Sequence, residues 1–233
     1  MQKAGRTLVV LFLCLFVTAC VVGQEDPDPL RFETEIRQFQ EWDSRNSFPE
    51  GAILFVGSSS IRLWQTARTF AHLPVVNRGF GGAHISDINH FINETTLKYR
   101  PGVIVFYAGD NDIWDGKEPE HVAEDFGDFL RSIWGSRKDT QVLFISIKPS
   151  RSRWSAWARM RKANLLVSTM ADSSDNLTFA DIAAVTLGED GLPDSTLFVE
   201  DQLHLNEEGY ARWESVVGPA LTSLYIRHGP WRK

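Results

Sequence analysis

The sequence AILFVGSSS at residues 52–60 is an unbroken apolar run that ends at Gly57 and is followed by three hydroxyl side chains. The turn-forming sequence PEG at residues 49–51 precedes the run. Turn-forming residues on both sides of a short apolar run indicate the limits of a buried strand. A helix-length segment, Ser60 to Phe70, comes next. This stretch therefore predicts a strand, a turn that carries serines, and a helix.

The same alternation continues along the chain. Further apolar runs lie at Val75-Val76, Val103–Tyr107, Val142–Ile147 and Leu177–Ala180. Further helix-length segments are Leu30–Trp42, Ile85–Tyr99, Pro119–Trp134, Trp154–Met170 and Glu207–Ile226, the last of which Asn206 could cap. Parallel strands need long crossovers, which are usually helical, so the pattern predicts one α/β domain with a parallel five-stranded sheet and helices on both faces. Ligands of such sheets bind outside the carboxyl ends of the strands.

Three of the predicted strands end in residues that suit a catalytic site. The serines at 58–60 stand where a helix N-terminus favours negative charge. The segment 77–82 holds three glycines, which permit close approach of a ligand, and segment 108–112 places Asn111 between two aspartates. Helix caps and plain turns explain each segment at least as well when it is taken alone.

Asp201 stands three residues before His204, just ahead of the last predicted helix. An aspartate in this position can accept a hydrogen bond from the imidazole ring, fix its tautomer and leave the other ring nitrogen free as a base. A structural histidine is the equal alternative. The remaining histidines are scattered and form no cluster with cysteines, so we expect no metal and no other cofactor.

Together these four segments resemble, in order and spacing, the conserved blocks of the SGNH hydrolases, also called GDSL esterases, over nearly the whole mature domain. The resemblance implies a flavodoxin-like three-layer α/β/α sandwich. It implies that Ser59 is the nucleophile of a triad with Asp201 and His204. It also implies an oxyanion hole formed by the backbone N–H groups of Ser59 and Gly82 and by the Asn111 amide. The expected activity is hydrolysis of carboxylic esters through an acyl-enzyme intermediate.

Ser58 stands where the family usually has the aspartate of its Gly-Asp-Ser motif. Ser58 and Ser60 also flank the nucleophile candidate, and only the distance from Gly57 selects Ser59. Because the expected base, His204, is in place, we expect an altered site rather than an inactive one. The alternatives are a non-catalytic binding lipoprotein of the same fold and a purely structural envelope protein.

The composition limits the class of partner. The chain has 233 residues, 43% hydrophobic content and a formal net charge of -6. This length is enough for one sizeable core, and the acidic balance argues against nucleic acid as a partner. We therefore expect a small-molecule ester as the substrate.

Residues 1–19 have the pattern of a signal peptide. Lys3 and Arg6 give a positive start, and Thr7–Phe16 is an apolar run too short for the ~20 residues of a membrane span. The leader therefore predicts an exported protein.

The sequence VTAC at residues 17–20 resembles the lipobox of bacterial lipoproteins, which implies that Cys20 is lipidated and becomes the mature N-terminus. Residues 20–29 would then form a tether and residues 30–233 the SGNH hydrolase domain. An ordinary secretory signal is the alternative. Val21, rather than aspartate, follows Cys20, and this resembles the outer-membrane sorting pattern. We expect a membrane protein of the bacterial cell envelope, anchored by its lipid and facing the periplasm or exterior.

Members of the family act on lysophospholipids, acyl glycerols, acetylated sugars and other small esters, so a lysophospholipase or lipase is a further alternative. The predicted elements use most of the mature chain and leave connections near the usual ~4 to 6 residues, which are too short for a helical lid. We therefore expect short acyl groups, acetyl among them. Aromatic and basic residues after the predicted strands could line the site, with core packing or solvation as the alternative: Trp64, Trp114, Trp154, Trp157, Arg62, Arg151 and Arg153.

Overall fold

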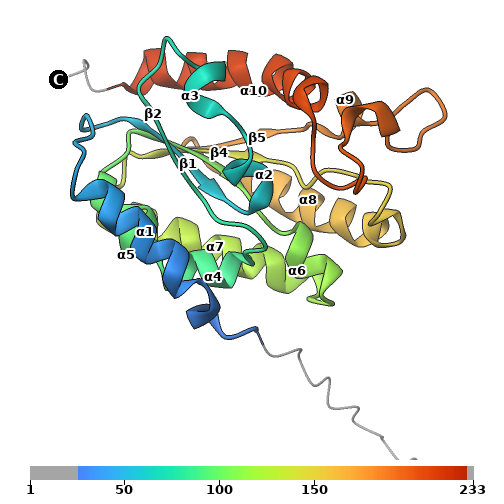
Figure 1. Ribbon diagram of the computed structural model, residues 1–233, viewed down its shortest axis with the longest axis horizontal. Coiled ribbons are helices and arrows are strands. Elements are labelled where there is room, and N and C mark those ends of the chain that lie inside the picture. The colour runs from blue at the N-terminus through green and yellow to red at the C-terminus, as the bar shows by residue number, and fades with distance from the viewer. Residues whose placement is uncertain (1–25, 230–233) are drawn as a thin grey trace, which may run out of the picture.

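The computed structural model describes residues 26–229, which form a twisted five-stranded sheet between two layers of helices (Figure 1). All strand pairs are parallel, and the strand order is β2-β1-β3-β4-β5. The strands are β1 Ile53–Gly57, β2 Val75–Gly79, β3 Val103–Tyr107, β4 Gln141–Ile145 and β5 Leu177–Ala180. The predicted three-layer α/β/α fold with a parallel five-stranded sheet is confirmed.

The central strands are almost entirely apolar because both of their faces are covered. Every residue of β1, β3 and β4 is buried. Leu54 and Val56 point to one helix layer, whereas Ile53 and Phe55 point to the other. A strand that is buried on both sides reads as a continuous apolar run, which is the pattern at residues 52–56.

The helices divide between the two faces of the sheet (Figure 1). The first layer contains α1 Glu33–Asp43, α4 Ile85–His90, α5 Ile92–Thr95, α7 Pro119–Ser136 and α8 Trp157–Asp172. The second contains α2 Ser59–Arg62, α3 Thr66–Thr69, α9 Ala183–Thr186 and α10 Glu207–His228. The short α6 Asp110–Trp114 follows β3, and the single-turn helices are η1 Pro29–Phe32, η2 Leu97–Tyr99, η3 Trp154–Ala156 and η4 Ser195–Leu197.

Two predicted helices are interrupted. The segment 60–70 forms α2 and α3 because the side-chain amide of Asn77 donates to the carbonyls of Ile61 and Trp64, 2.7 and 3.3 Å away. Those carbonyls would otherwise continue the helical ladder. The segment 85–99 likewise divides into α4, α5 and η2. Asn206 caps α10 as expected, since its side chain accepts from the N–H of Gly209 at 3.0 Å.

The N-terminal segment contacts the domain from the first described residue. Asp26 forms an ion pair with Lys117, and the Asp28 side chain caps η1. Part of the predicted 20–29 tether is therefore held against the fold. The predicted signal peptide, residues 1–19, and the predicted lipidation site, Cys20, lie outside the described residues. Between residues 26 and 229, no helix is long and apolar enough to cross a membrane.

Candidate active site

The serine turn joins β1 to α2 at the carboxyl edge of the sheet. A Cβ atom on Gly57 would lie 1.9 Å from the Tyr107 carbonyl oxygen, so the close approach of β3 requires glycine there. Ser59 is the first residue of α2 and retains 8% of its exposure, whereas Ser58 and Ser60 retain none. Of the three adjacent serines, Ser59 is the one that reaches the surface.

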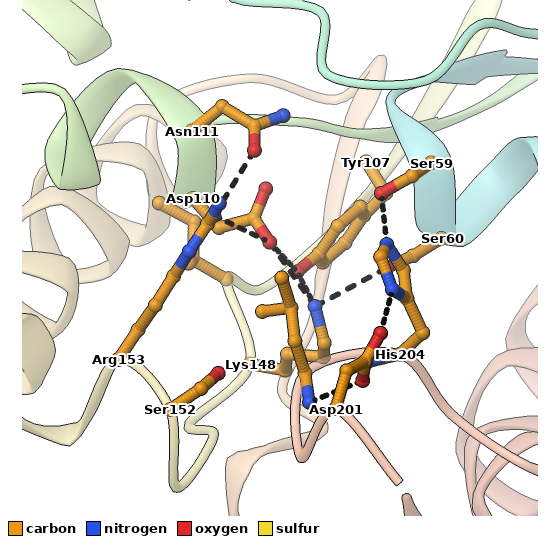
Figure 2. Close-up of polar contacts among 12 residues, drawn as sticks. Ser59, Ser60, Tyr107, Asp110, Asn111, Lys148, Ser152, Arg153, Asp201 and His204 are labelled. Carbon is orange, nitrogen blue, oxygen red and sulfur yellow. Dashed lines mark hydrogen bonds and ion pairs between the residues drawn. The ribbon is translucent and has the colours of Figure 1, made fainter. Parts of the chain in front are cut away.

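Ser59, His204 and Asp201 form a continuous chain of hydrogen bonds (Figure 2). The Nε2 atom of His204 lies 2.9 Å from the Ser59 Oγ, and its Nδ1 lies 2.6 Å from an Asp201 carboxylate oxygen. The loop between η4 and α10 carries both Asp201 and His204. The structure thus brings together the three predicted triad residues, although 145 positions separate Ser59 from His204.

The Asp201 carboxylate is held in its ionised form. Burial alone would raise its pKa, but hydrogen bonds from the backbone and ring of His204 and from the N–H of Leu203 outweigh that effect and lower the pKa to about 2. An ionised carboxylate beside Nδ1 orients the ring so that Nε2 faces Ser59.

The segments that carry the predicted oxyanion groups follow β2 and β3, the two strands that lie on either side of β1 in the sheet. Gly82 follows β2 with φ of +81°, a backbone conformation that favours glycine, and its α-carbon faces open space. Asn111 follows β3 in α6 and is buried. Its Nδ2 donates to the carbonyl of Ala83 at 3.0 Å, which joins the two loops directly.

A buried charged cluster behind the serine turn was not predicted. The Lys148 ammonium, on the segment after β4, donates to Ser60 Oγ, Tyr107 OH and the Asp110 carboxylate at 3.2, 3.0 and 3.1 Å (Figure 2). Burial would raise the Asp110 pKa, but Lys148 and Arg153 reverse the effect and lower it. A lysine directly after an apolar run was the only sequence signal for this cluster.

The aromatic and basic residues considered as site residues lie in different surroundings. Trp64 belongs to the core, where it packs on Tyr210 and Trp213. Trp114 is about half exposed and lies beside the Arg153 guanidinium, which also donates to Asn111. Of the others, Arg62 packs against Gly81, next to the predicted oxyanion residue Gly82, whereas Arg151 donates to the Pro193 carbonyl and Trp154 stacks on Trp157.

A family model described as the GDSL-like Lipase/Acylhydrolase family matches residues 57–212. The chain belongs to this family. The match begins at the serine turn and extends past His204, so it spans all the residues of the site. No group of three or more His, Cys, Asp or Glu side chains within residues 26–229 of this GDSL-family protein is arranged to hold a metal ion.

Solved structures share the fold of this GDSL-family domain at low identity. A Streptococcus pneumonia protein named after platelet activating factor has a TM-score of 0.73 and 18% identity, and the match covers 82% of this chain and 94% of that one. A GDSL-like lipase from Bacteroides thetaiotaomicron has a TM-score of 0.69 and 17% identity, and the match covers 81% of this chain and 97% of the lipase. An acetyl xylan esterase from Geobacillus stearothermophilus has a TM-score of 0.54 and 15% identity, and the match covers 73% of this chain and 94% of the esterase. No curated protein matches the sequence.

Proposed function

We propose that this protein is a serine esterase that cleaves carboxylic esters through an acyl-enzyme intermediate. The observation that carries the proposal is the hydrogen-bonded chain from Ser59 through His204 to Asp201. A hydroxyl at 2.9 Å from an imidazole nitrogen, with the other nitrogen held by a carboxylate, is the arrangement that activates serine for nucleophilic attack. Membership in a family of lipases and acylhydrolases supports the same activity.

The proposed reaction has two halves. Ser59 Oγ bonds to the carbonyl carbon as its proton passes to His204 Nε2, and the N–H groups of Ser59, Gly82 and Asn111 stabilise the oxyanion. His204 then gives the proton to the alcohol oxygen as the ester C–O bond breaks. A water molecule next attacks the acyl-enzyme while His204 takes its proton, and the acid leaves as the proton returns to Ser59.

We propose short acyl groups, acetyl among them, for the acid part of the ester. The similarity in fold to an acetyl xylan esterase supports this choice. An open pocket of about 950 Å³, lined by His204, Leu63, Val199 and Tyr210 among others, supports a larger alcohol part. His204 protonates the leaving oxygen in the proposed reaction, so the alcohol lies on the imidazole side, where this pocket is.

We also propose that Cys20 is lipidated and anchors the domain to a membrane of the bacterial envelope, the outer membrane in particular. The lipobox-like sequence at residues 17–20 supports this proposal. Acyl chains on Cys20 would replace the apolar leader as the anchor.

The catalytic proposal is tested by three matched alanine variants of the serine turn. Ser59→Ala should lower kcat for nitrophenyl acetate by at least a thousandfold with an unchanged melting temperature, because it deletes one hydroxyl and no core volume. Ser58→Ala and Ser60→Ala should keep most of the activity. Loss of turnover in either control, with Ser59→Ala still active, would assign the nucleophile to another serine.

A further inference from the structure

We infer that Arg153 is a positioning residue for ester hydrolysis: it holds the side-chain amide of Asn111 in the orientation that the oxyanion requires. Arg153 lies on the segment after β4, directly before η3. The inference rests on the proposed function, because it assumes that Asn111 donates to the oxyanion. It adds the segment after β4 to a site otherwise built from the segments after β1, β2 and β3 and from the loop before α10.

The amide of Asn111 is held at both of its ends. An Arg153 guanidinium N–H donates to Asn111 Oδ1 at 3.0 Å, and Asn111 Nδ2 donates to the Ala83 carbonyl at 3.0 Å. In Figure 2 the amide oxygen faces Arg153, and the amide nitrogen lies on the opposite side. An amide nitrogen has two hydrogens, so one of them remains free for the substrate.

Arg153 makes the reversed orientation of this amide unfavourable. Rotation by 180° would place the NH₂ group against the guanidinium, where both partners are donors. It would also place the amide oxygen against the Ala83 carbonyl, where both are acceptors. Two hydrogen bonds would be lost and two buried polar groups left unpaired. A partner such as a hydroxyl, which donates and accepts, would impose no such choice.

The guanidinium has a second effect on Asn111. A positive charge at the amide oxygen draws electron density from the N–H bonds, and hydrogen bonds in such a chain strengthen one another in a buried site. The side chain of Arg153 is only 13% exposed, so water screens this charge weakly. The free N–H of Asn111 therefore becomes a stronger donor to a developing negative charge.

Neighbouring side chains hold the Arg153 guanidinium in place, but the buried carboxylate among them has a second ion-pair partner. The guanidinium lies 3.5 Å from the Asp110 carboxylate and 5.6 Å from the centre of the Trp114 ring. Lys148 also pairs with Asp110, at 3.1 Å, and is 1% exposed. Because Lys148 keeps the buried carboxylate paired, loss of the Arg153 guanidinium should leave the fold intact.

The test uses Arg153→Met, which keeps the aliphatic length and removes the donors. We expect an about 10- to 100-fold lower kcat for nitrophenyl acetate, a smaller loss than the ~10²- to 10³-fold that removal of a whole oxyanion donor causes, and a KM within twofold of wild type. Arg153→Lys should restore part of kcat. The control is Arg151→Met on the same loop, whose parent side chain bonds the Pro193 carbonyl, and it should retain wild-type kinetics.

A double-mutant cycle separates positioning from other roles. In an Asn111→Ala background, Arg153→Met should lower kcat by less than twofold further, because its effect passes through Asn111. If the two substitutions lower kcat by independent factors that multiply in the double variant, the inference is wrong. It is also wrong if Arg153→Met raises KM and leaves kcat unchanged, because Arg153 would then be a substrate-binding residue. If Arg153→Met does not fold, the same cycle is run with Arg153→Lys.

The two proposals fail in different ways. If Ser59→Ala remains active, the proposed serine esterase is wrong whatever Arg153 does. If Ser59→Ala is inactive while Arg153→Met has wild-type kcat, the esterase proposal stands and the positioning role of Arg153 is wrong.

Discussion

The side chain of Ser58 is fully buried beside Ser59, and its hydroxyl has no hydrogen-bond partner among the described residues. Its backbone N–H still bonds the Tyr107 carbonyl at 2.9 Å, which ties the serine turn to β3. The family usually has an acid at this position. In this chain Ser58 helps to hold the serine turn through its backbone N–H and not through its side chain. The turn can therefore present Ser59 without a carboxylate at position 58.

This geometry predicts that Ser58→Ala stabilises the protein. A buried hydroxyl without a partner costs roughly 1 to 3 kcal/mol, and the change removes it with little loss of volume. We expect the free energy of unfolding to rise by about 1 kcal/mol. Urea unfolding followed by tryptophan fluorescence measures the difference. A variant that is less stable than wild type by that amount would indicate that a bound water pairs with the hydroxyl.

Asp112 links two elements at the edge of the site. Its carboxylate, on α6, accepts from the Ile85 N–H at the start of α4 at 3.0 Å and lies 3.5 Å from the Lys117 ammonium. Complete burial raises its pKa to about 6, although His84 and Lys117 oppose the shift. The folded state therefore holds the Asp112 proton more tightly than the unfolded chain, where the pKa is near 3.8.

The sign of this shift gives a pH-dependent prediction. The stability that the protonated carboxyl contributes is fully present below about pH 4 and is lost as the pH rises through about 6. Asp112→Asn keeps an acceptor for Ile85 and has no such loss. Its free energy of unfolding, relative to wild type, should therefore increase between pH 4.5 and pH 8. Urea unfolding at the two pH values checks this, and a constant or decreasing difference would contradict it.

Elements made mostly of apolar residues were predicted well, and elements that depend on distant partners were not. The ranges of β3 and β5 match the predicted runs. The strand β2 extends beyond Val76 to Gly79 because the buried Arg78 pairs with Asp43 and Tyr99, which lie 35 and 21 positions away. Local periodicity carries no information about such partners.

The dependence on distant partners also separates the site residues that could be predicted from those that could not. Ser59, Gly82, Asn111, Asp201 and His204 stand in sequence blocks that resemble those of a known family, so their positions could be named in advance. Lys148 stood in no such block, and Arg153 was named only as one of several residues that could line the site. Their partners Asp110 and Asn111 lie 38 and 42 positions away. Only the folded sheet brings the ends of β3 and β4 together.

The predicted site residues of the molecule lie together at the carboxyl edge of one sheet. The strand order places β2 and β3 on either side of β1, so the segments that carry Gly82 and Asn111 follow the two strands beside the serine turn, while the loop before α10 carries Asp201 and His204. Open parallel sheets bind ligands at this edge. The arrangement leaves the pocket beside His204, where the proposed alcohol part lies, open to solvent.

We predict a preference for short acyl chains. Without a helical lid over the acyl site, little of a long acyl tail would be buried, and each methylene left in water forgoes ~0.8 kcal/mol of possible binding. The value of kcat/KM should therefore not rise along a series of nitrophenyl esters from acetate to palmitate, each measured below its micelle concentration. A maximum at the long-chain end would favour the lipase or lysophospholipase alternative.

A separate prediction concerns the envelope. Cys20→Ser should yield a protein that is not lipidated and no longer partitions with membranes, because the acyl chains are the proposed anchor. Fractionation of cells that express either form, with mass spectrometry of the N-terminal peptide, measures this. Wild-type protein that is wholly soluble and carries an unmodified Cys20 would contradict the anchor.

The most direct test of the proposed serine esterase is covalent labelling with a fluorophosphonate, followed by mass spectrometry of the peptide that contains residues 58–60. The geometry predicts one label per chain, attached to Ser59, with loss of ester hydrolysis in proportion to labelling. The Ser59→Ala protein should take up none. A fully labelled Ser58 or Ser60, or a wild-type protein that hydrolyses esters normally without any label on Ser59, would contradict the account.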